Sequence, residues 1–399
     1  MKLSALFAVV LCTGFALTGS TAQSSARPAF VTERAVLVMR HGIRAPLSGE
    51  VPDGTRTATP WPKWSVADSR ITSHGARALE IVAGEDRKWL AAKGLLDPQG
   101  CPTAGAVRIA SNSSERTIDS GQDYANGFAP GCAIAVEHRP VGTVDPMFEP
   151  LRAHATTFDA KAAIVDINRS TGGMTALVQR HAREIAELDR VLGCGSGCVP
   201  GAPPRVSAED DGHGIALEGP IRGTSGVAQV LLLQYVEGLP ARDVGWGRVD
   251  AAGLKRLGAL HAALFAVFTR SPYTAEHQAA LLGRRVLQSL KAGPKLDVLM
   301  GHDTNVTALA AALDVDLVTS GYATNDVPPG GALLFERVRE TQSGRAFVRV
   351  SYRTQSPEAL RSGGRAMTVA PLRVPGCGGE LCPVAVFERV LSARLAAVR

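Results

Sequence analysis

The sequence predicts an α/β protein, in which a three-layer sheet domain carries an inserted, mainly helical domain. Three observations lead to this prediction. Short, unbroken apolar runs, typical of strands buried on both faces of a sheet, occur near both ends of the chain. Segments with apolar residues at helical spacing alternate with these runs, as in layered α/β proteins. The middle of the chain shows helical periodicity with few strand signals.

The first part of the sheet domain is expected to contain two strands and two helices. Ala35–Met39 (AVLVM) and Val107–Ala110 (VRIA) have the short apolar pattern of buried strands. A helix is expected over Ser73–Leu95, where apolar residues recur at helical spacing. A second is expected over Ser113–Phe128, because this segment opens on a serine suited to the N-cap and has Glu115 in its first turn.

The sheet domain is expected to resume near Lys295, after the insert. Helical periodicity predicts helices in the insert over Ala176–Leu192, Val227–Glu237, Leu254–Thr269 and Ala275–Leu290. The later apolar runs predict strands over Leu296–Met300, Leu333–Arg337 and Phe347–Tyr352. The expected division is residues 29–155 and 291–399 for the sheet domain and residues 156–290 for the helical domain.

Residues 1–22 are expected to be a signal peptide that is removed on export. Lys2 precedes an apolar stretch from Leu3 to Leu17, and small and polar residues up to Ala22 suit a signal peptidase site. The alternative, a membrane anchor, needs about 20 apolar residues, and this run is shorter. Export also suits the cysteines, because Cys12 leaves with the signal and an even number remains.

The six remaining cysteines allow fifteen disulfide pairings. Their clustering along the chain favours Cys194–Cys198 and Cys377–Cys382 as local bonds, which leaves Cys101–Cys132. The alternative is a metal site, but Cys194 and Cys198 have no nearby pair of histidines to complete a zinc site.

The chain carries a surplus of positive charge, with 43 lysines and arginines against 37 acidic residues, and only eight of the cations are lysine. Arginine matches the oxygens of carboxylates and phosphates better than lysine does. A nucleic-acid partner is not expected, because the sequence has no basic run and no aromatic residues interleaved with cations. The charge favours a small anionic ligand.

The first candidate motif, Arg40-His41-Gly42-Ile43-Arg44-Ala45-Pro46, directly follows the first expected strand. Ligands of open α/β sheets bind beyond the carboxyl ends of strands. Two arginines that flank a histidine at such a position form a site for a dianion, and Gly42 is expected to let the backbone turn tightly and approach a ligand. A solvated surface histidine is the alternative, which the strand context disfavours.

The second motif, Gly301-His302-Asp303-Thr304-Asn305, also follows an apolar strand. His302 can donate a hydrogen bond to a phosphoryl oxygen, and Asp303 can protonate a leaving oxygen. The alternative is a metal-binding His-Asp pair, but the other histidines are scattered singly, so no metal site is expected. Among them, His261 lies on an apolar helix and is expected to be structural.

A third element, Ser114-Glu115-Arg116-Thr117, opens the helix after the second strand. Because a helix N-terminus attracts anions, Arg116 could complete a cradle with Arg40 and Arg44. An exposed arginine in a first helical turn is common, so this prediction depends on the two other motifs.

Together, Arg40–Pro46, Ser114–Thr117 and Gly301–Asn305 resemble the signature of the histidine acid phosphatases, in particular the bacterial periplasmic phytases and glucose-1-phosphatases. The resemblance covers the chain from about Glu33 to Cys382 and continues through Asp145-Pro146, Gln234–Pro240, Gly245–Gly247 and Pro328–Gly331. It implies a histidine-phosphatase fold, similar to phosphoglycerate mutase, with a helical insert, local disulfides, no metal and no other cofactor.

The resemblance also implies a role for each motif residue. His41 would be the nucleophile that forms a phosphohistidine. Asp303 would protonate the leaving alkoxide and then accept a proton from the attacking water. The three equatorial phosphoryl oxygens would be bound by Arg40, Arg44, Arg116 and His302. The implied activity is that of an acid phosphatase with an acidic optimum, located in the periplasm or secreted.

Leu47 and Glu237 are the candidates for substrate specificity. Phytases usually have threonine where Leu47 stands, whereas glucose-1-phosphatases tend to have leucine and a Tyr-x-Glu-Gly stretch like the one around Glu237. Phytate, glucose-1-phosphate and similar sugar or inositol phosphates are all open as substrates. The alternatives are a phosphotransferase on the same scaffold and a non-catalytic phosphate-binding protein. The expected partner is a small phosphomonoester, without nucleic acid or, after signal cleavage, a membrane, and the expected state is a monomer or weak dimer.

Overall fold

The computed structural model describes residues 29–398, so the expected signal peptide, residues 1–22, lies outside the described residues. One mixed sheet contains eight of the described strands: β1 (Phe30–Arg40), β2 (Val107–Ser111), β3 (Val136–Glu137), β6 (Leu296–Gly301), β7 (Ala332–Glu340), β8 (Ala346–Thr354), β9 (Thr368–Leu372) and β10 (Leu381–Pro383). Their order is β10-β8-β7-β1-β6-β2-β3, and β9 pairs with β8. The pairs among β1, β6, β2 and β3 are parallel, and the remaining pairs are antiparallel.

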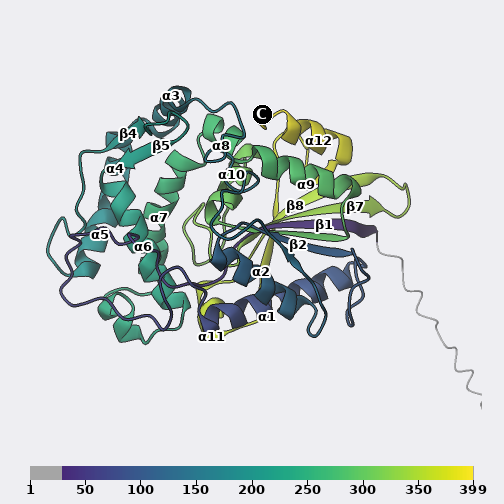
Figure 1. The fold of residues 1–399 in the computed structure, drawn as a ribbon, viewed down its shortest axis with the longest axis horizontal. Helices are drawn as coiled ribbons and strands as arrows, with labels where there is room; N and C mark the ends of the chain where they lie inside the picture. The colour runs from purple at the N-terminus through teal and green to yellow at the C-terminus, as the bar shows by residue number, and fades with distance from the viewer. Residues whose placement is uncertain (1–28, 399) are drawn as a thin grey trace, which may run out of the picture.

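Helices cover both faces of this sheet, as Figure 1 shows. One layer consists of α1 (Ser73–Ala92) and α2 (Glu115–Phe128), and the other of α9 (Ala280–Ala292), α10 (Asp303–Ala312) and α12 (Val384–Ser392). The central strand β1 explains the unbroken apolar run, because its alternate side chains enter the two layers. Ala35, Leu37 and Met39 pack with the first layer, and Val36 and Val38 pack with the second. The predicted three-layer α/β architecture is therefore confirmed.

The parallel register brings three strand ends to one edge of the sheet. Arg40 at the end of β1 pairs with Gly301 at the end of β6, and Ser111 at the end of β2 pairs with Met300. The segments that follow these ends, which carry all three motifs, therefore begin side by side.

The chain between β3 and α9 forms a mainly helical part that lies beside the sheet in Figure 1. Its core includes Leu188, Leu231 and Leu257, which are fully buried. Its elements are α3 (Ala160–Thr171), α4 (Met174–Arg180), α5 (Ala182–Leu192), the hairpin β4 (Arg205–Ala208) and β5 (Ile215–Glu218), α6 (Pro220–Val236), the 3₁₀ turns η1 (Ala241–Asp243) and η2 (Gly245–Gly247), α7 (Ala251–Phe268) and α8 (Pro272–Gln278). A further short helix, α11 (Pro357–Ser362), packs against α6.

Several of these elements differ from the expected ones. The helix expected over residues 176–192 is divided at His181 into α4 and α5, and the one expected over 275–290 is divided at Ala279 into α8 and α9. α6 begins earlier than expected, at Pro220, because proline suits the first helical turn. The β4–β5 hairpin was not predicted.

The position of α9 bears on the division into domains. Leu282, Val286 and Leu290 of this helix pack in the same core as Val36 and Val38 of the sheet. The expected boundary at residue 290 would separate α9 from the layer to which it contributes. We therefore propose that the helical insert ends near Ala279, where α8 gives way to α9.

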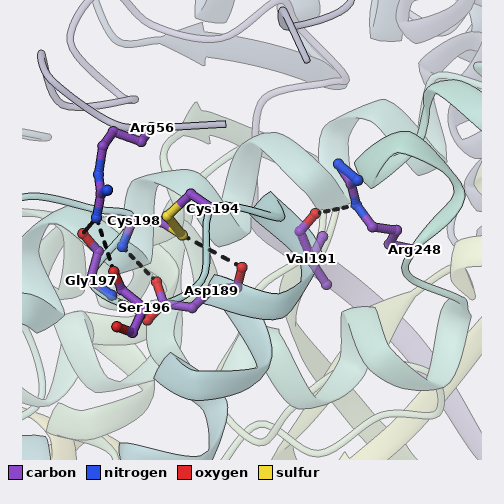
Figure 2. The surroundings of a disulfide bond; sticks show 8 residues. All are labelled: Arg56, Asp189, Val191, Cys194, Ser196, Gly197, Cys198 and Arg248. Atoms are coloured by element: carbon purple, nitrogen blue, oxygen red, sulfur yellow. Dashed lines mark hydrogen bonds between the residues drawn. A yellow bond between two sulfur atoms is a disulfide. The ribbon is translucent and has the colours of Figure 1, made fainter. Parts of the chain in front are cut away.

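The three favoured disulfides are present in the structure, as Cys101–Cys132, Cys194–Cys198 and Cys377–Cys382. The turn that Cys194–Cys198 closes is also held by hydrogen bonds (Figure 2). The Asp189 carboxylate accepts the backbone N–H groups of Gly197 and Cys198, each at 2.8 Å. Arg56 donates to the carbonyl oxygen of Ser196 at 2.9 Å, which ties the turn to the loop that precedes α1.

Among the described residues, α7 is the one helix long and apolar enough to cross a membrane by length and composition alone. Half of it is buried, and Leu254, Leu257 and Leu260 lie in the core of the helical part. A core helix of a soluble protein meets the same test, so the expected absence of membrane contact stays a prediction.

Candidate active site

The aligned strand ends border a cavity of about 560 Å³. Residues from all three motifs line it, namely His41, Arg44, Arg116, His302 and Asp303. Arg40 is fully buried and lies behind this lining. The structure therefore brings the predicted site residues together, with Arg40 in a second layer.

The ring of His41 is buried, and its Nδ1 lies 2.8 Å from the carbonyl oxygen of Gly42. Because a carbonyl only accepts, Nδ1 carries the proton and Nε2 keeps its lone pair. Burial, followed by the charges of Arg116 and the two other motif arginines, holds the pKa of His41 well below its usual value. The imidazole is therefore neutral at moderately acidic pH and presents Nε2 as a nucleophile.

Gly42 serves packing rather than the expected tight turn. It has no positive φ, and a Cβ at this position would lie 2.6 Å from Cδ1 of Leu79 on α1. Its N–H donates to Oγ of Ser120 on α2 at 3.0 Å. The missing side chain thus lets the segment that carries His41 lie directly against the first helical layer.

Arg40 is the charge partner of Asp303. Its Nη2 lies 3.1 Å from Oδ2 of Asp303 and donates to Oε1 of Gln229 at 2.8 Å. Its Nη1 donates to the carbonyl oxygen of Val327 at 2.5 Å. Its Nε is buried and has no hydrogen-bond acceptor among the described residues.

Arg44 is held by Glu50, a residue that sequence reasoning missed. The two Nη atoms lie 2.8 and 2.9 Å from the carboxylate oxygens, and the same carboxylate accepts the N–H of Leu47 at 2.7 Å. Burial alone would raise the pKa of Glu50, but the hydrogen bond and charge of Arg44 outweigh it, and the pKa is lowered. Glu50 therefore stays ionised, fixes the Arg44 guanidinium and places Leu47 in the cavity wall.

Arg116 completes a set of three arginines whose Nε atoms are buried without a hydrogen-bond acceptor among the described residues. It lies in the first turn of α2, and burial, with the nearby charge of Arg44, lowers its pKa to about 10. Its Nε is buried without an acceptor among the described residues, as are those of Arg40 and Arg44. A buried donor that is left unpaired is costly. The charges of the three arginines act together on the imidazole of His41, and such a cluster of guanidinium groups suits an anion with several oxygens.

His302 is the N-cap of α10 and is held on three sides. Its N–H donates to Oδ1 of Asn305 at 2.9 Å, and its ring lies between Arg116 and Asn112. Because Arg116 can only donate, Nδ1 accepts and Nε2 carries the proton toward Oδ1 of Asn112, 3.1 Å away. Burial, then the charge of Arg116, lowers the pKa of His302 to about 3. The ring is neutral, and both of its nitrogens are engaged with protein groups.

Asp303 begins α10 and points into the cavity with a side chain that is 17% exposed. Burial raises the pKa of this carboxyl, but the positive charge of Arg40, supported by His261 and His302, outweighs burial and lowers the pKa to about 2. Asp303 is therefore ionised in the protein without ligand at all but strongly acidic pH.

Three residues that hold the site were missed by sequence reasoning, namely Glu50, Asn112 and Gln229. Asn112 directly follows the β2 strand, and its place at a strand end is a signal that could have identified it. Glu50 lies in a loop and Gln229 within an apolar helix, and nothing in their local sequence indicates that they meet Arg44 and Arg40.

The two specificity candidates have different positions. Leu47 lines the cavity, as expected. Glu237 does not: it follows the last turn of α6, and its carboxylate accepts the hydroxyl of Thr72 at 2.6 Å. The carboxylate of Glu237 instead supports Thr72, the residue that caps α1.

No protein-family model matches the chain, but several characterised proteins are similar to it along nearly their whole length. Phytase AppA of Escherichia coli is 28% identical over 94% of this chain and 95% of its own. The glucose-1-phosphatase of Salmonella typhimurium is 28% identical over 98% of this chain and 99% of its own.

Solved structures agree with this similarity. A phytase of Hafnia alvei in complex with tartrate is 28% identical and superposes with a TM-score of 0.85 over 93% of this chain and 98% of its own. The phytase of Citrobacter braakii is 26% identical, with a TM-score of 0.84 over 92% of this chain and 98% of its own. The sheet, both helical layers and the helical insert are thus shared with these enzymes.

Proposed function

The chain belongs to the histidine acid phosphatases, in the branch of bacterial phytases and glucose-1-phosphatases, and we propose that it hydrolyses small phosphate monoesters through a phosphohistidine at His41. The observation that carries the proposal is a neutral imidazole with three arginine charges near it, of which Arg44 and Arg116 line the cavity and Arg40 lies behind it. A phosphoryl group in the cavity meets the charges of these arginines and places its phosphorus next to Nε2 of His41.

The proposed reaction has two displacements. In the first, Nε2 of His41 attacks phosphorus and forms a P–N bond while the bond to the leaving oxygen breaks, and the carboxyl of Asp303 gives its proton to that oxygen. In the second, water attacks phosphorus, its proton passes to Asp303, and the P–N bond breaks. Arg40, Arg44 and Arg116 stabilise the charge on the equatorial oxygens in both transition states.

His302 takes a related part in this proposal. Its Nε2–H, now donated to Asn112, is the N–H that it offers to a phosphoryl oxygen when a ligand is bound. Asn112 then acts as the residue that holds the ring in the correct tautomer between turnovers.

The proton needed by the leaving group is coupled to substrate binding. Asp303 has a pKa of about 2 because the positive charge of Arg40, with smaller contributions from His261 and His302, outweighs the effect of burial. A phosphate dianion among the three arginines offsets these charges and therefore raises the pKa of Asp303 toward its usual value. Substrate binding is thus accompanied by proton uptake, which accounts for an acidic optimum.

The wall of the cavity favours esters with a single phosphate. Beyond the arginines it is lined by apolar side chains, among them Leu47, Phe148 and Phe268, and by uncharged polar ones such as Thr269 and Gln278. The further cation in the lining, Arg152, is paired with Glu149. We propose that the leaving group is a compact, uncharged one such as a sugar, because a polyphosphorylated ring would need several more free cations.

The first prediction tests the chemistry and the substrate. The purified protein, assayed at pH 4–6, should hydrolyse p-nitrophenyl phosphate and glucose-1-phosphate, with a lower kcat/KM for phytate. Activity should persist in EDTA, because no metal is expected to take part. His41→Ala should lower kcat by at least about 10³-fold, since it removes the nucleophile.

The surface variant His138→Ala, a histidine outside the cavity, serves as the control and should retain full activity. Loss of all activity in EDTA, a rate maximum above pH 8 or normal turnover by His41→Ala would each overturn the mechanism.

We also propose that the protein is exported to the periplasm or beyond, with residues 1–22 removed. Three disulfides within residues 29–398 support an oxidising compartment. N-terminal sequencing of the exported protein should begin at Gln23, and an intact Met1 on that protein would contradict cleavage.

A further inference from the structure

His261 lies between two carboxylates, although its place on an apolar helix suggested a purely structural role. Its ring is buried on α7, with Nδ1 2.8 Å from Oδ1 of Asp326 and Nε2 3.9 Å from Oδ2 of Asp303. Asp303 is the acid of the proposed function. The histidine is thus the only titratable group in the described residues that contacts both Asp303 and a second buried carboxylate.

The structure makes specific room for this arrangement. Gly258 lies one turn before His261 on α7, and a Cβ there would be 2.4 Å from Oδ2 of Asp326. The ring of Phe265, one turn after His261, packs against the imidazole with the ring centres 4.5 Å apart. Asp326 is 3% exposed and therefore has little contact with solvent. These contacts orient the ring so that Nδ1 faces Asp326 and Nε2 faces Asp303.

A second cavity, of about 220 Å³, is lined by both His261 and Asp303. The separation of 3.9 Å between Nε2 and Oδ2 exceeds a direct hydrogen bond, but a small side-chain rotation or one water in this cavity closes the gap. A proton can therefore pass between the imidazole and the carboxylate without crossing the substrate cavity.

We propose that the His261–Asp326 pair is a proton store for Asp303, so that the leaving group is protonated from two linked sites rather than from one carboxyl alone. This inference rests on the proposed function. Nε2–H of His261 gives its proton to Oδ2 of Asp303, and Asp303 gives it to the leaving oxygen. In the second displacement the proton lost by water returns through Asp303 to Nε2. One proton leaves and one returns in each cycle, and His261 ends as it began.

A store is useful here because Asp303 alone holds its proton poorly before substrate binds, with a pKa of about 2. The imidazole offers a base next to it, and Asp326 balances the positive charge when that base is protonated. The imidazole therefore gives the proton a second place to reside beside Asp303.

The charged and titratable groups around His261 come from every element packed against it. The acidic groups are Asp326 in the loop before β7, Asp303 in α10 and Glu50 in the loop after β1. The cations are Arg40 at the end of β1, Arg44 in the loop after β1 and Arg222 on α6. The phenols of Tyr322 and Tyr352 lie near Asp326. The arginines are matched by Glu50 and the two aspartates, so a proton on His261 is not opposed by a net positive surrounding.

The second prediction separates this role from a structural one by leaving-group and pH dependence. In His261→Gln, kcat for a poor leaving group, glycerol 2-phosphate, should fall about tenfold or more at pH 6, whereas kcat for p-nitrophenyl phosphate should fall less than about threefold. The alkaline limb of the kcat profile for glycerol 2-phosphate should move to lower pH by about one unit. A good leaving group needs little protonation, so its rate reports whether the rest of the site is intact.

Two further variants keep the test decisive. Asp326→Asn retains a side-chain acceptor for Nδ1–H but removes the charge, and should show the same selective loss in smaller measure. His277→Gln is the matched control, because His277 is also a buried histidine of the helical part and bonds Thr156 at 2.9 Å instead of the site. It should leave the ratio of the two substrates and the pH limb unchanged.

The possible outcomes distinguish the two proposals. If the wild-type protein hydrolyses neither ester, the proposed function fails. If it hydrolyses both esters, the phosphatase proposal stands. The proton store is then wrong if His261→Gln and Asp326→Asn lower kcat for the two esters equally, or if they leave the ratio of the two rates and the alkaline limb as in the wild type. Thermal melts of each variant show that the compared proteins are folded.

Discussion

The two neutral histidines of the cavity make the folded protein less stable in acid. In the unfolded chain His302 takes up a proton near its usual pKa, whereas in the folded protein its pKa is about 3. As the pH falls below about 6.5, the unfolded state therefore binds more protons than the folded state, and stability is lost progressively until the folded pKa is reached. His41, whose pKa is also well below its usual value, adds to this loss.

The third prediction follows from this loss of stability in acid. His302→Gln keeps a donor toward Asn112 but cannot be protonated, so its free energy of unfolding relative to the wild type should improve by about 2 kcal/mol between pH 8 and pH 4.5. Denaturant unfolding at the two pH values measures the difference. The exposed-site variant His138→Gln should show the same relative stability at both. A His302→Gln effect that is equal at pH 8 and pH 4.5 would contradict the assignment of a neutral, buried ring.

At the scale of an element, α1 is the wall against which the catalytic loop is built. A Cβ at Gly75 would lie 2.1 Å from the backbone oxygen of Ile43, between His41 and Arg44. A Cβ at Gly84, further along the same helix, would meet nothing closer than 3.5 Å. Alanine at either position would favour the helix, but only alanine at Gly75 would occupy space that the loop requires.

The fourth prediction uses this pair. Gly75→Ala should destabilise the protein by about 1–3 kcal/mol or more and lower kcat, because the helix and the loop that carries His41 must move apart. Gly84→Ala should leave kcat unchanged and be neutral or stabilising by up to about 1 kcal/mol. Unfolding curves and initial rates measure both. Equal behaviour of the two variants would show that α1 does not set the position of the loop.

Strands and helices could be predicted where they depend on the local sequence pattern, but not where their ends depend on packing against other parts of the molecule. The run Ala35–Met39 predicted a strand buried on both faces, and the motif at its end could be placed because parallel strands end at one edge. The break at Ala279 was not predictable, since apolar spacing continues across it, and the core of the sheet in which α9 packs is formed by segments far away along the chain.

At the scale of the whole molecule, the site is completed by contacts between the sheet and the helical part. Gln229 on α6 and His261 on α7 reach Arg40 and Asp303, which belong to the sheet and its second helical layer. Gln229 and His261 look like ordinary core residues in their own sequence context. The catalytic groups could therefore be predicted from the motifs, whereas the groups that tune and hold them could not, because they come from a segment far away along the chain.

The chain is also held as a whole by its disulfides, and the fifth prediction concerns the longest link. Cys101–Cys132 spans 31 residues and ties the segment before β2 to the segment after α2, and Cys101 is exposed, so its removal costs little packing. Replacing both cysteines by alanine should lower the free energy of unfolding by about 3–4 kcal/mol in the chain-entropy model, because the unfolded chain regains the freedom of that loop.

The bond Cys377–Cys382 spans only five residues and restricts the unfolded chain by about 2 kcal/mol in the same model. Its two sulfurs are buried, however, so the matching Cys377→Ala/Cys382→Ala variant also loses packing. Wild-type protein treated with a reductant after unfolding should therefore lose the sum of these contributions and refold poorly, as expected for a chain that folds in an oxidising compartment.

A Cys101→Ala/Cys132→Ala variant that unfolds within 1 kcal/mol of the wild type would show that the link does not constrain the unfolded chain.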